Sequence, residues 1–169
     1  MSMKFEIAAW DYKTMPAIRA VYGNYAAHPS FVKDIVHLVG GVKTEVGASW
    51  LLEHHLDNDG KGLDDNLIDQ IYSSVTGLTH RGSRLHILQC MGRMPIPEKR
   101  IEDIEEFLRV CLEDQSKFVR AWTYSGIHAL AVQYESYQEE AIEMIEEAAQ
   151  GDPAASVRAR CRKLIEQGF

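Results

Sequence analysis

The sequence has 169 residues, of which 46% are hydrophobic and 25% are charged, and its formal net charge is −7. This length and composition are ordinary for a globular protein, so we expect residues 1–169 to form a single domain. No apolar run approaches the roughly 20 residues that cross a bilayer, and the first residues contain too short an apolar stretch for a signal peptide. The acidic total, taken as a bulk number, argues against a nucleic-acid-binding protein.

Apolar residues recur every three or four positions along most of the chain, which is typical of amphipathic helices. In chain order, helices are predicted near residues 14–27, 30–39, 43–57, 63–75, 79–93, 97–114, 116–134, 136–150 and 153–167. The five prolines lie at or near the gaps between these segments, where proline is tolerated. No segment alternates as a strand does, so the fold is predicted to be all-α. Residues 1–12 carry no clear pattern and are compatible with extended chain.

The three cysteines are far apart in the sequence, and each lies among apolar neighbours in a helical pattern. They are Cys90, Cys111 and Cys161. An odd number of widely separated cysteines favours reduced, buried thiols in a cytoplasmic protein over a disulfide framework.

The C-terminal half repeats itself with a period of 38 residues. Asp114, Val119, Arg120 and Ala121 return as Asp152, Val157, Arg158 and Ala159. An aspartate in the turn between two helices, followed by a Val-Arg pair and small residues, resembles the mark of HEAT repeats. The resemblance covers residues 97–167, and its clearest repeats are 97–134 and 135–169.

The resemblance implies a right-handed α-solenoid of about four stacked antiparallel helix pairs with an extra N-terminal helix, in which each pair is buried by its neighbours. In HEAT proteins, aspartates and arginines of neighbouring repeats bond in a ladder. The resemblance therefore implies a structural role for Asp114, Arg120, Asp152 and Arg158. In the first half of the chain, a register of 38 and a register of 42 each align part of the pattern, and the choice between them stays open.

The net charge hides an uneven distribution between the two helices of each pair. In HEAT stacks the first helix lies outside and the second lines the concave side. The expected outer helices, 30–39, 63–75, 97–114 and 135–150, carry 0, −3, −4 and −6. The expected inner helices, 43–57, 79–93, 116–134 and 154–167, carry −2, +3, +2 and +3. A basic groove can attract an anionic partner despite an acidic total. The alternative is that these cations are structural or simply solvent-exposed.

Aromatic residues gather on the same inner helices, and aromatic rings beside arginines can hold stacked bases or peptide anchors. The candidate residues for a concave binding surface are Trp50, Glu53, Arg84, Tyr124, His128 and Arg162. Trp122 falls near the face of Val119 and Ile127, and we expect it in the core.

Two local patterns resemble metal sites and fail closer tests. The adjacent His54 and His55 diverge by about 100° on a helix, whereas a zinc helix places ligands four residues apart. The acidic run 57–65 lacks acids at the first and twelfth positions of a calcium loop, so it is interpreted as a turn that caps the next helix. We expect no metal and no cofactor.

Two functions stay open. The first is a non-catalytic interaction module that binds a protein or peptide partner, and the basic helices would suit an anionic one. The second is a nucleic-acid-binding protein similar in architecture to the HEAT-like DNA alkylation-repair glycosylases, although no motif of that family matches residue by residue. No nucleophile motif or phosphate-binding loop is present, no membrane partner is expected, and the sequence does not determine the oligomeric state.

Overall fold

The computed structural model describes residues 1–169, and the chain is helical throughout, with no β-strand. The ten α-helices are α1 (Met3–Ala9), α2 (Met15–Tyr25), α3 (Phe31–Val39), α4 (Glu45–Asp57), α5 (Asp65–Ser74), α6 (Arg81–Cys90), α7 (Ile101–Leu112), α8 (Lys117–Gln133), α9 (Gln138–Gly151) and α10 (Ala155–Gln167). Four short 3₁₀ turns are η1 (Val75–Gly77), η2 (Met91–Arg93), η3 (Glu98–Arg100) and η4 (Glu135–Tyr137). The prediction of an all-α fold is confirmed.

The nine helices predicted from residue 14 onward correspond in order to α2 through α10, but the suggestion of an extended N-terminus is wrong. Residues 3–9 form α1, which begins after Ser2, whose Oγ accepts a hydrogen bond from the amide of Phe5 at 3.4 Å. Met3 and Ile7, one helical turn apart, are both buried. A helix of seven residues is not stable alone in water, so its packing against α2 and α4 stabilises it.

Side-chain caps mark where two of the later helices begin. Asp64 accepts a hydrogen bond from the amide of Leu67 at 2.9 Å before α5, and Ser116 accepts one from the amide of Val119 at 3.5 Å before α8. Each cap satisfies an amide that has no partner within its helix. The acidic run 57–65 therefore ends in a helix cap, as predicted.

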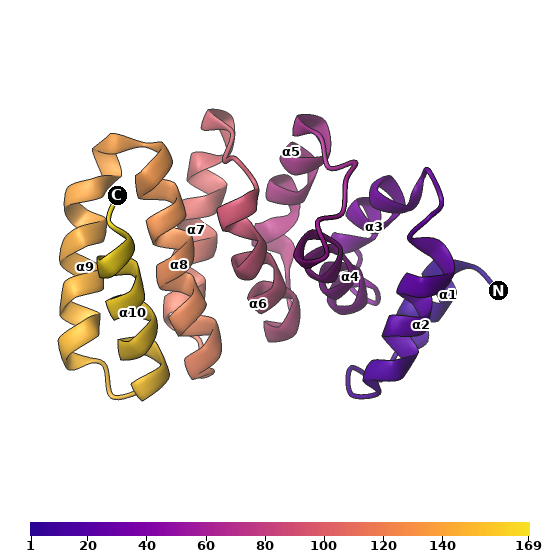
Figure 1. Ribbon diagram of the computed structural model, residues 1–169, viewed down its shortest axis with the longest axis horizontal. Helices are drawn as coiled ribbons and strands as arrows, with labels where there is room; N and C mark the ends of the chain where they lie inside the picture. Colours follow the sequence, from indigo (N-terminus) through magenta and orange to yellow (C-terminus); the bar gives the residue numbers. More distant parts are fainter.

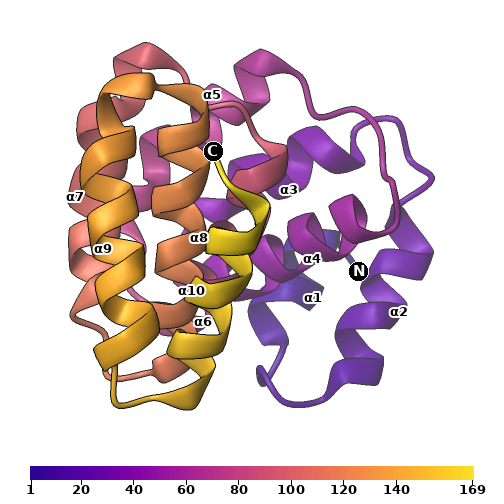
Figure 2. The same ribbon diagram turned by 60° about the vertical axis from the view of Figure 1, so that its left-hand side comes forward.

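The helices follow one another along the longest axis of the molecule, from α1 and α2 at one end to α9 and α10 at the other (Figure 1). Helices α4, α6, α8 and α10 pack on one another in that order, and α3, α5 and α7 form a second series beside them. Figure 2 shows α7 and α9 on one side of α8 and α10. We call the surface formed by α4, α6, α8 and α10 the even-helix face.

The interior consists of two hydrophobic clusters. A cluster of 32 buried residues extends from α1 to α8, and a cluster of seven lies between α8, α9 and α10. All three cysteines are buried and free, which confirms the prediction of buried thiols. Burial raises the pKa of Cys111 and of Cys161 to about 12. None of the helices is both long enough and apolar enough to cross a lipid bilayer.

Candidate functional site

The turns that lead into α6, α8 and α10 share one backbone contact. In each, an arginine on the first turn of the helix donates a hydrogen bond to the carbonyl six residues earlier. The pairs are Arg84 to Leu78 (3.1 Å), Arg120 to Asp114 (3.0 Å) and Arg158 to Asp152 (2.6 Å). The structural register between these helices is therefore 36 residues and then 38. Neither of the registers considered for the first half, 38 and 42, is the one that this contact indicates.

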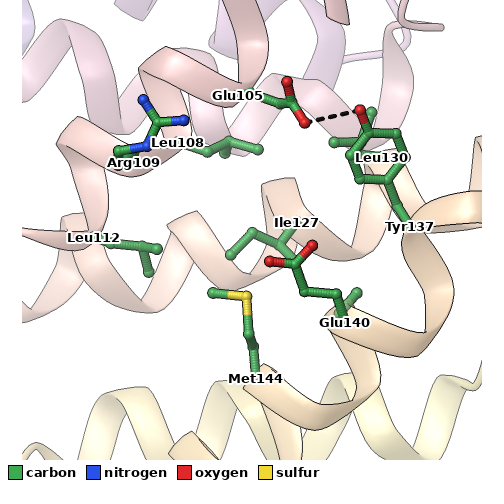
Figure 3. Close-up of a pocket in the computed structure, with 10 residues that line it drawn as sticks. Glu105, Leu108, Arg109, Leu112, Ile127, Leu130, Tyr137, Glu140 and Met144 are labelled. Atoms are coloured by element: carbon green, nitrogen blue, oxygen red, sulfur yellow. Dashed lines mark hydrogen bonds between the residues drawn. The ribbon is translucent and has the colours of Figure 1, made fainter. Parts of the chain in front are cut away.

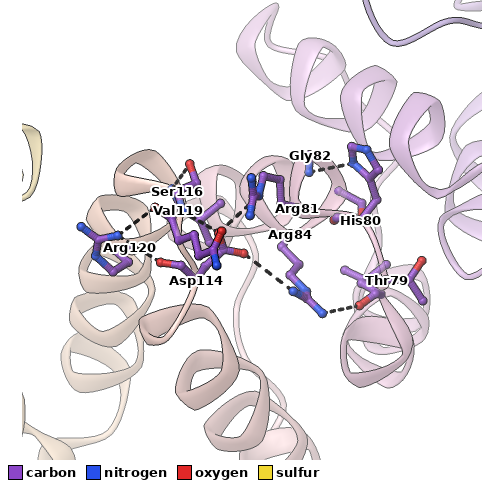
Figure 4. Close-up of polar contacts among 12 residues, drawn as sticks. Thr79, His80, Arg81, Gly82, Arg84, Asp114, Ser116, Val119 and Arg120 are labelled. Atoms are coloured by element: carbon purple, nitrogen blue, oxygen red, sulfur yellow. Dashed lines mark hydrogen bonds and ion pairs between the residues drawn. The ribbon is translucent and has the colours of Figure 1, made fainter.

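Asp114 joins two of these turns through its side chain (Figure 4). Its carboxylate lies 3.3 Å from Arg81 Nε and 3.7 Å from Arg84 Nη1, and it accepts the amide of Ser116 at 2.7 Å. Asp152 makes the same local bond, to the amide of Ala154 at 2.8 Å, but no arginine faces its carboxylate. The contacts of Arg120 and Arg158 thus lie within their own turns, and the ion pairs between successive turns are those of Asp114.

A groove of about 520 Å³ opens on the even-helix face between α6, α8 and α10. We call it the Trp122 groove. Its apolar lining includes Leu88, Met91 and Met94 on one side and Leu164 on the other. About half of the residues that line it are polar, among them Gln89, Arg93 and Gln167, so the groove offers both apolar and polar contacts to a ligand.

The centre of the Trp122 groove is a cation–π pair. The guanidinium carbon of Arg160 on α10 lies 3.7 Å from the ring centroid of Trp122 on α8. Partial burial lowers the pKa of Arg160, and no carboxylate pairs with it. Ser125, one turn after Trp122, has a buried hydroxyl with no hydrogen-bond partner. The groove therefore contains a cation without a counter-ion and a hydroxyl without a partner.

His128 lies at the C-terminal edge of the groove. Its Nε2–H donates to the carbonyl of Gly168 at 2.7 Å, and its ring lies 4.8 Å from that of Phe169. These contacts hold the segment after α10 against α8. His128 is the one residue of the predicted binding set that lines this groove.

A carboxylate pair lies farther along the even-helix face, on α4. Arg93 Nη1 bonds to Asp57 Oδ1 at 2.5 Å, and Asp57 in turn interacts with Glu53 one helical turn earlier. Burial, together with a hydrogen bond to Asp57, raises the pKa of Glu53 to about 7. The bond from Glu53 and the charge of Arg93 lower the pKa of Asp57. The pKa values of the two carboxyl groups are therefore displaced in opposite directions, so Glu53 is the one that holds a proton more readily.

Trp50 lies on α4 one turn before this pair. Its ring stacks on His54 with centroids 4.7 Å apart and an interplanar angle of 16°, and Trp10 lies 6.4 Å away. The register of 36 and then 38 places His86, Trp122 and Arg160 at equivalent positions of α6, α8 and α10. The direct contact of Trp122 with Arg160 joins two of these positions.

The other predicted residues lie elsewhere. Arg84 bonds to the carbonyl of Leu78 and pairs with Asp114. Tyr124 is half-buried against the cluster of seven residues between α8, α9 and α10. Arg162 is exposed on α10 and makes no ion pair. Trp122 packs on the core, as predicted, but it also lines the groove, which was not expected.

The buried histidine of the His54-His55 pair has a structural role. His55 bonds through Nε2 to the carbonyl of Lys61 at 2.9 Å and through Nδ1 to the hydroxyl of Tyr22 at 3.1 Å. No group of three or more histidine, cysteine or acidic side chains is arranged to hold a metal ion.

Sequence and structure comparisons add no relative from which a role could be inferred. No protein-family model, curated protein or solved structure matches the chain.

Proposed function

We propose that the chain is a non-catalytic, HEAT-like α-solenoid module, and that the even-helix face is its concave side. Its Trp122 groove binds a peptide segment of a partner protein. The observation that carries this proposal is the Trp122–Arg160 pair, which lies beside apolar walls and has no counter-ion. The fitting ligand has an apolar side chain for Val132, the exposed apolar residue of the groove, and an adjacent carboxylate for Arg160.

The distribution of charge favours a peptide over a nucleic acid. The segment 79–93 owes its +3 to Arg81, Arg84 and Arg93, and all three are paired with Asp114 or Asp57. On the same face, the cations without a carboxylate partner are Lys117 and Arg120 of α8 and Arg158, Arg160, Arg162 and Lys163 of α10, of which Arg120 and Arg158 are engaged with backbone carbonyls of their own turns. A nucleic-acid backbone needs a track of free cations, because each phosphate contact is made by one. A single carboxylate needs only one.

The proposal is tested by selecting short random peptides on the purified protein and titrating the enriched ones by fluorescence anisotropy. We expect the enriched peptides to pair an apolar residue with an acidic one. Trp122→Ala and Arg160→Ala should each weaken binding about tenfold or more. The matched control is Arg162→Ala, which removes the same charge from the same helix outside the groove and should bind normally.

A salt series with duplex DNA distinguishes the second function, nucleic-acid binding, from peptide binding. Phosphate contacts would give an affinity that falls steeply with salt from about 50 mM upward. Steep salt-dependent DNA binding that Arg160→Ala abolishes, with no peptide enriched, would replace the peptide proposal by nucleic-acid binding. Peptides that bind Trp122→Ala as tightly as the wild type would show that the Trp122 groove is not their binding site.

A further inference from the structure

A second groove of about 290 Å³ lies between α7 and α9, with α8 at its floor (Figure 3). We call it the α7–α9 groove. Leu108 and Leu112 of α7 form one wall, Met144 of α9 forms the other, and Ile127 and Leu130 of α8 form the floor. The floor and both walls are apolar.

The groove exists because α9 does not continue the series in which α3, α5 and α7 pack on one another. Helix α3 packs on α5 and α5 packs on α7, whereas α9 packs mainly on α8 and α10. At one end, Tyr137 of η4 donates a hydrogen bond from its hydroxyl to Glu105 Oε1 at 2.8 Å and spans the gap. Between that bond and Leu112, α7 and α9 do not close over α8, so Ile127 is partly exposed at the floor while Leu130 beside it is buried.

The segments on both sides of the groove are acidic. Residues 97–114 carry a net charge of −4 and residues 135–150 carry −6. Lys99 and Arg100 of the first segment lie outside the groove and both pair with Asp69. Arg109 is the single cation that lines the groove, together with Glu105 and Glu140. An anionic ligand or a second copy of this acidic surface would therefore be repelled.

We infer that the α7–α9 groove binds a basic amphipathic helix of a partner protein. Such a helix places apolar side chains three or four residues apart on one face, which suits a narrow slot with an apolar floor. Its lysines and arginines then face the carboxylates of α7 and α9 on both sides. This partner differs in chemistry from the acidic peptide proposed for the Trp122 groove, and the inference does not depend on that proposal.

The probe is a fluorescent amphipathic peptide with leucines on one helical face and lysines on the other. One matched peptide replaces the lysines by glutamates, and another replaces the leucines by glutamines. We expect saturable binding of the Leu/Lys peptide at low ionic strength, with an affinity that falls as salt rises. Neither matched peptide should bind comparably, because one lacks the charge and the other lacks the apolar face.

Met144→Glu separates groove binding from general attraction to an acidic protein. The variant adds a negative charge, which would strengthen non-specific binding, but it also makes the apolar wall polar. We expect the Leu/Lys peptide to bind Met144→Glu about tenfold more weakly. The control Ile165→Glu adds the same charge at an exposed position of α10 and should bind at least as tightly as the wild type.

A surface variant covers the possibility that Met144→Glu does not fold, which a thermal melt would show. Glu140→Lys with Glu143→Lys reverses two charges on α9 and should weaken binding about tenfold, whereas Glu166→Lys on α10 should not. Equal or tighter binding to Met144→Glu, equal binding of the Leu-to-Gln peptide, or no saturable binding of the Leu/Lys peptide would each overturn the inference. Trp122→Ala should leave this binding unchanged, so the two grooves are tested separately.

Discussion

The guanidinium of Arg84 on α6 lies 3.7 Å from the carboxylate of Asp114, in the turn before α8. Arg81 approaches the same carboxylate at 3.3 Å, and the side chain of Asp114 is only 5% exposed. A nearly buried carboxylate with two arginine partners links successive turns of the structure and is costly to remove, since its arginines would lose their counter-ion.

Asp114→Ala should lower the free energy of unfolding by about 2 kcal/mol, a value below that of a fully buried pair because both arginines are partly exposed. Asp152→Ala is the matched control, because the Asp152 carboxylate makes the same local bond to an amide two residues on and forms no ion pair with an arginine. It should cost about 1 kcal/mol. Urea denaturation measures both, and equal losses would show that the arginine contacts contribute nothing.

The helices were predictable because the burial of one helix face requires apolar residues every three or four positions, and this spacing is visible in the sequence. Ile104, Phe107, Leu108 and Cys111 form a stripe in the sequence, and all four are buried in α7. The first helix escaped prediction because only Met3 and Ile7 in it are buried, and two positions do not establish a period.

The register of the first half was missed for a different physical reason. The shared contact is made to a backbone carbonyl, so the residue that supplies the carbonyl can be Asp114, Asp152 or Leu78. A search for the aspartate therefore passes over Leu78.

The candidate site was only partly visible in the sequence. Trp122 and Arg160 are 38 residues apart, which is the period found in the C-terminal half, so that period already carried a signal for the pair. The interaction of Glu53 with Asp57 was also visible as two acids one helical turn apart. Arg93 could not be assigned to them, because it lies 36 residues after Asp57 and only the packing of the helices brings the two side chains together.

Glu53 should make stability depend on pH near neutrality. Its pKa rises from the ordinary 4.5 to about 7 in the folded state, so between these values the folded chain binds more protons than the unfolded chain. The contribution of Glu53 is therefore fully present below pH 4.5 and is lost as the pH rises through 7. The lowered pKa of Asp57 changes stability only below pH 3.8, its ordinary pKa, and so does not contribute between pH 4.5 and pH 7.

Glu53→Gln removes this dependence while keeping a side chain of the same size. We expect the unfolding free energy of the variant, relative to the wild type, to rise between pH 5 and pH 8 in urea titrations. The difference between the two proteins isolates Glu53 from the other groups that titrate in the same range. Two parallel pH curves would contradict the raised pKa of Glu53.

His86 should act in the opposite direction. Burial lowers its pKa from 6.5 to about 4, and its Nδ1 lies 2.9 Å from the hydroxyl of Ser49. The stability that comes from keeping this ring neutral is present above pH 6.5 and is lost as the pH falls through 4. His86→Gln should lose less stability than the wild type between pH 6.5 and pH 4, and His37→Gln, at an exposed position of α3, should follow the wild type. An imidazole NMR titration that places His86 near 6.5 would contradict this prediction.

The reaction rates of the three buried thiols should show that different parts of the fold open at different free energies. Burial raises the pKa of each one, so each must become exposed before it reacts as a thiolate. Cys90 and Cys111 belong to the cluster of 32 residues, whereas Cys161 belongs to the cluster of seven at the end of the helical series. A small terminal cluster opens at lower free energy than a large central one.

In native buffer, Cys161 should therefore react with a disulfide reagent faster than Cys90 or Cys111, by about tenfold for each 1.4 kcal/mol of difference in opening free energy. The rates are measured on proteins that keep one cysteine each, with the other two replaced by alanine or serine. A peptide or helix that binds near α9 and α10 should slow the reaction of Cys161 selectively, because binding stabilises the closed form. Equal rates at all three positions would indicate that the chain opens as one cooperative unit.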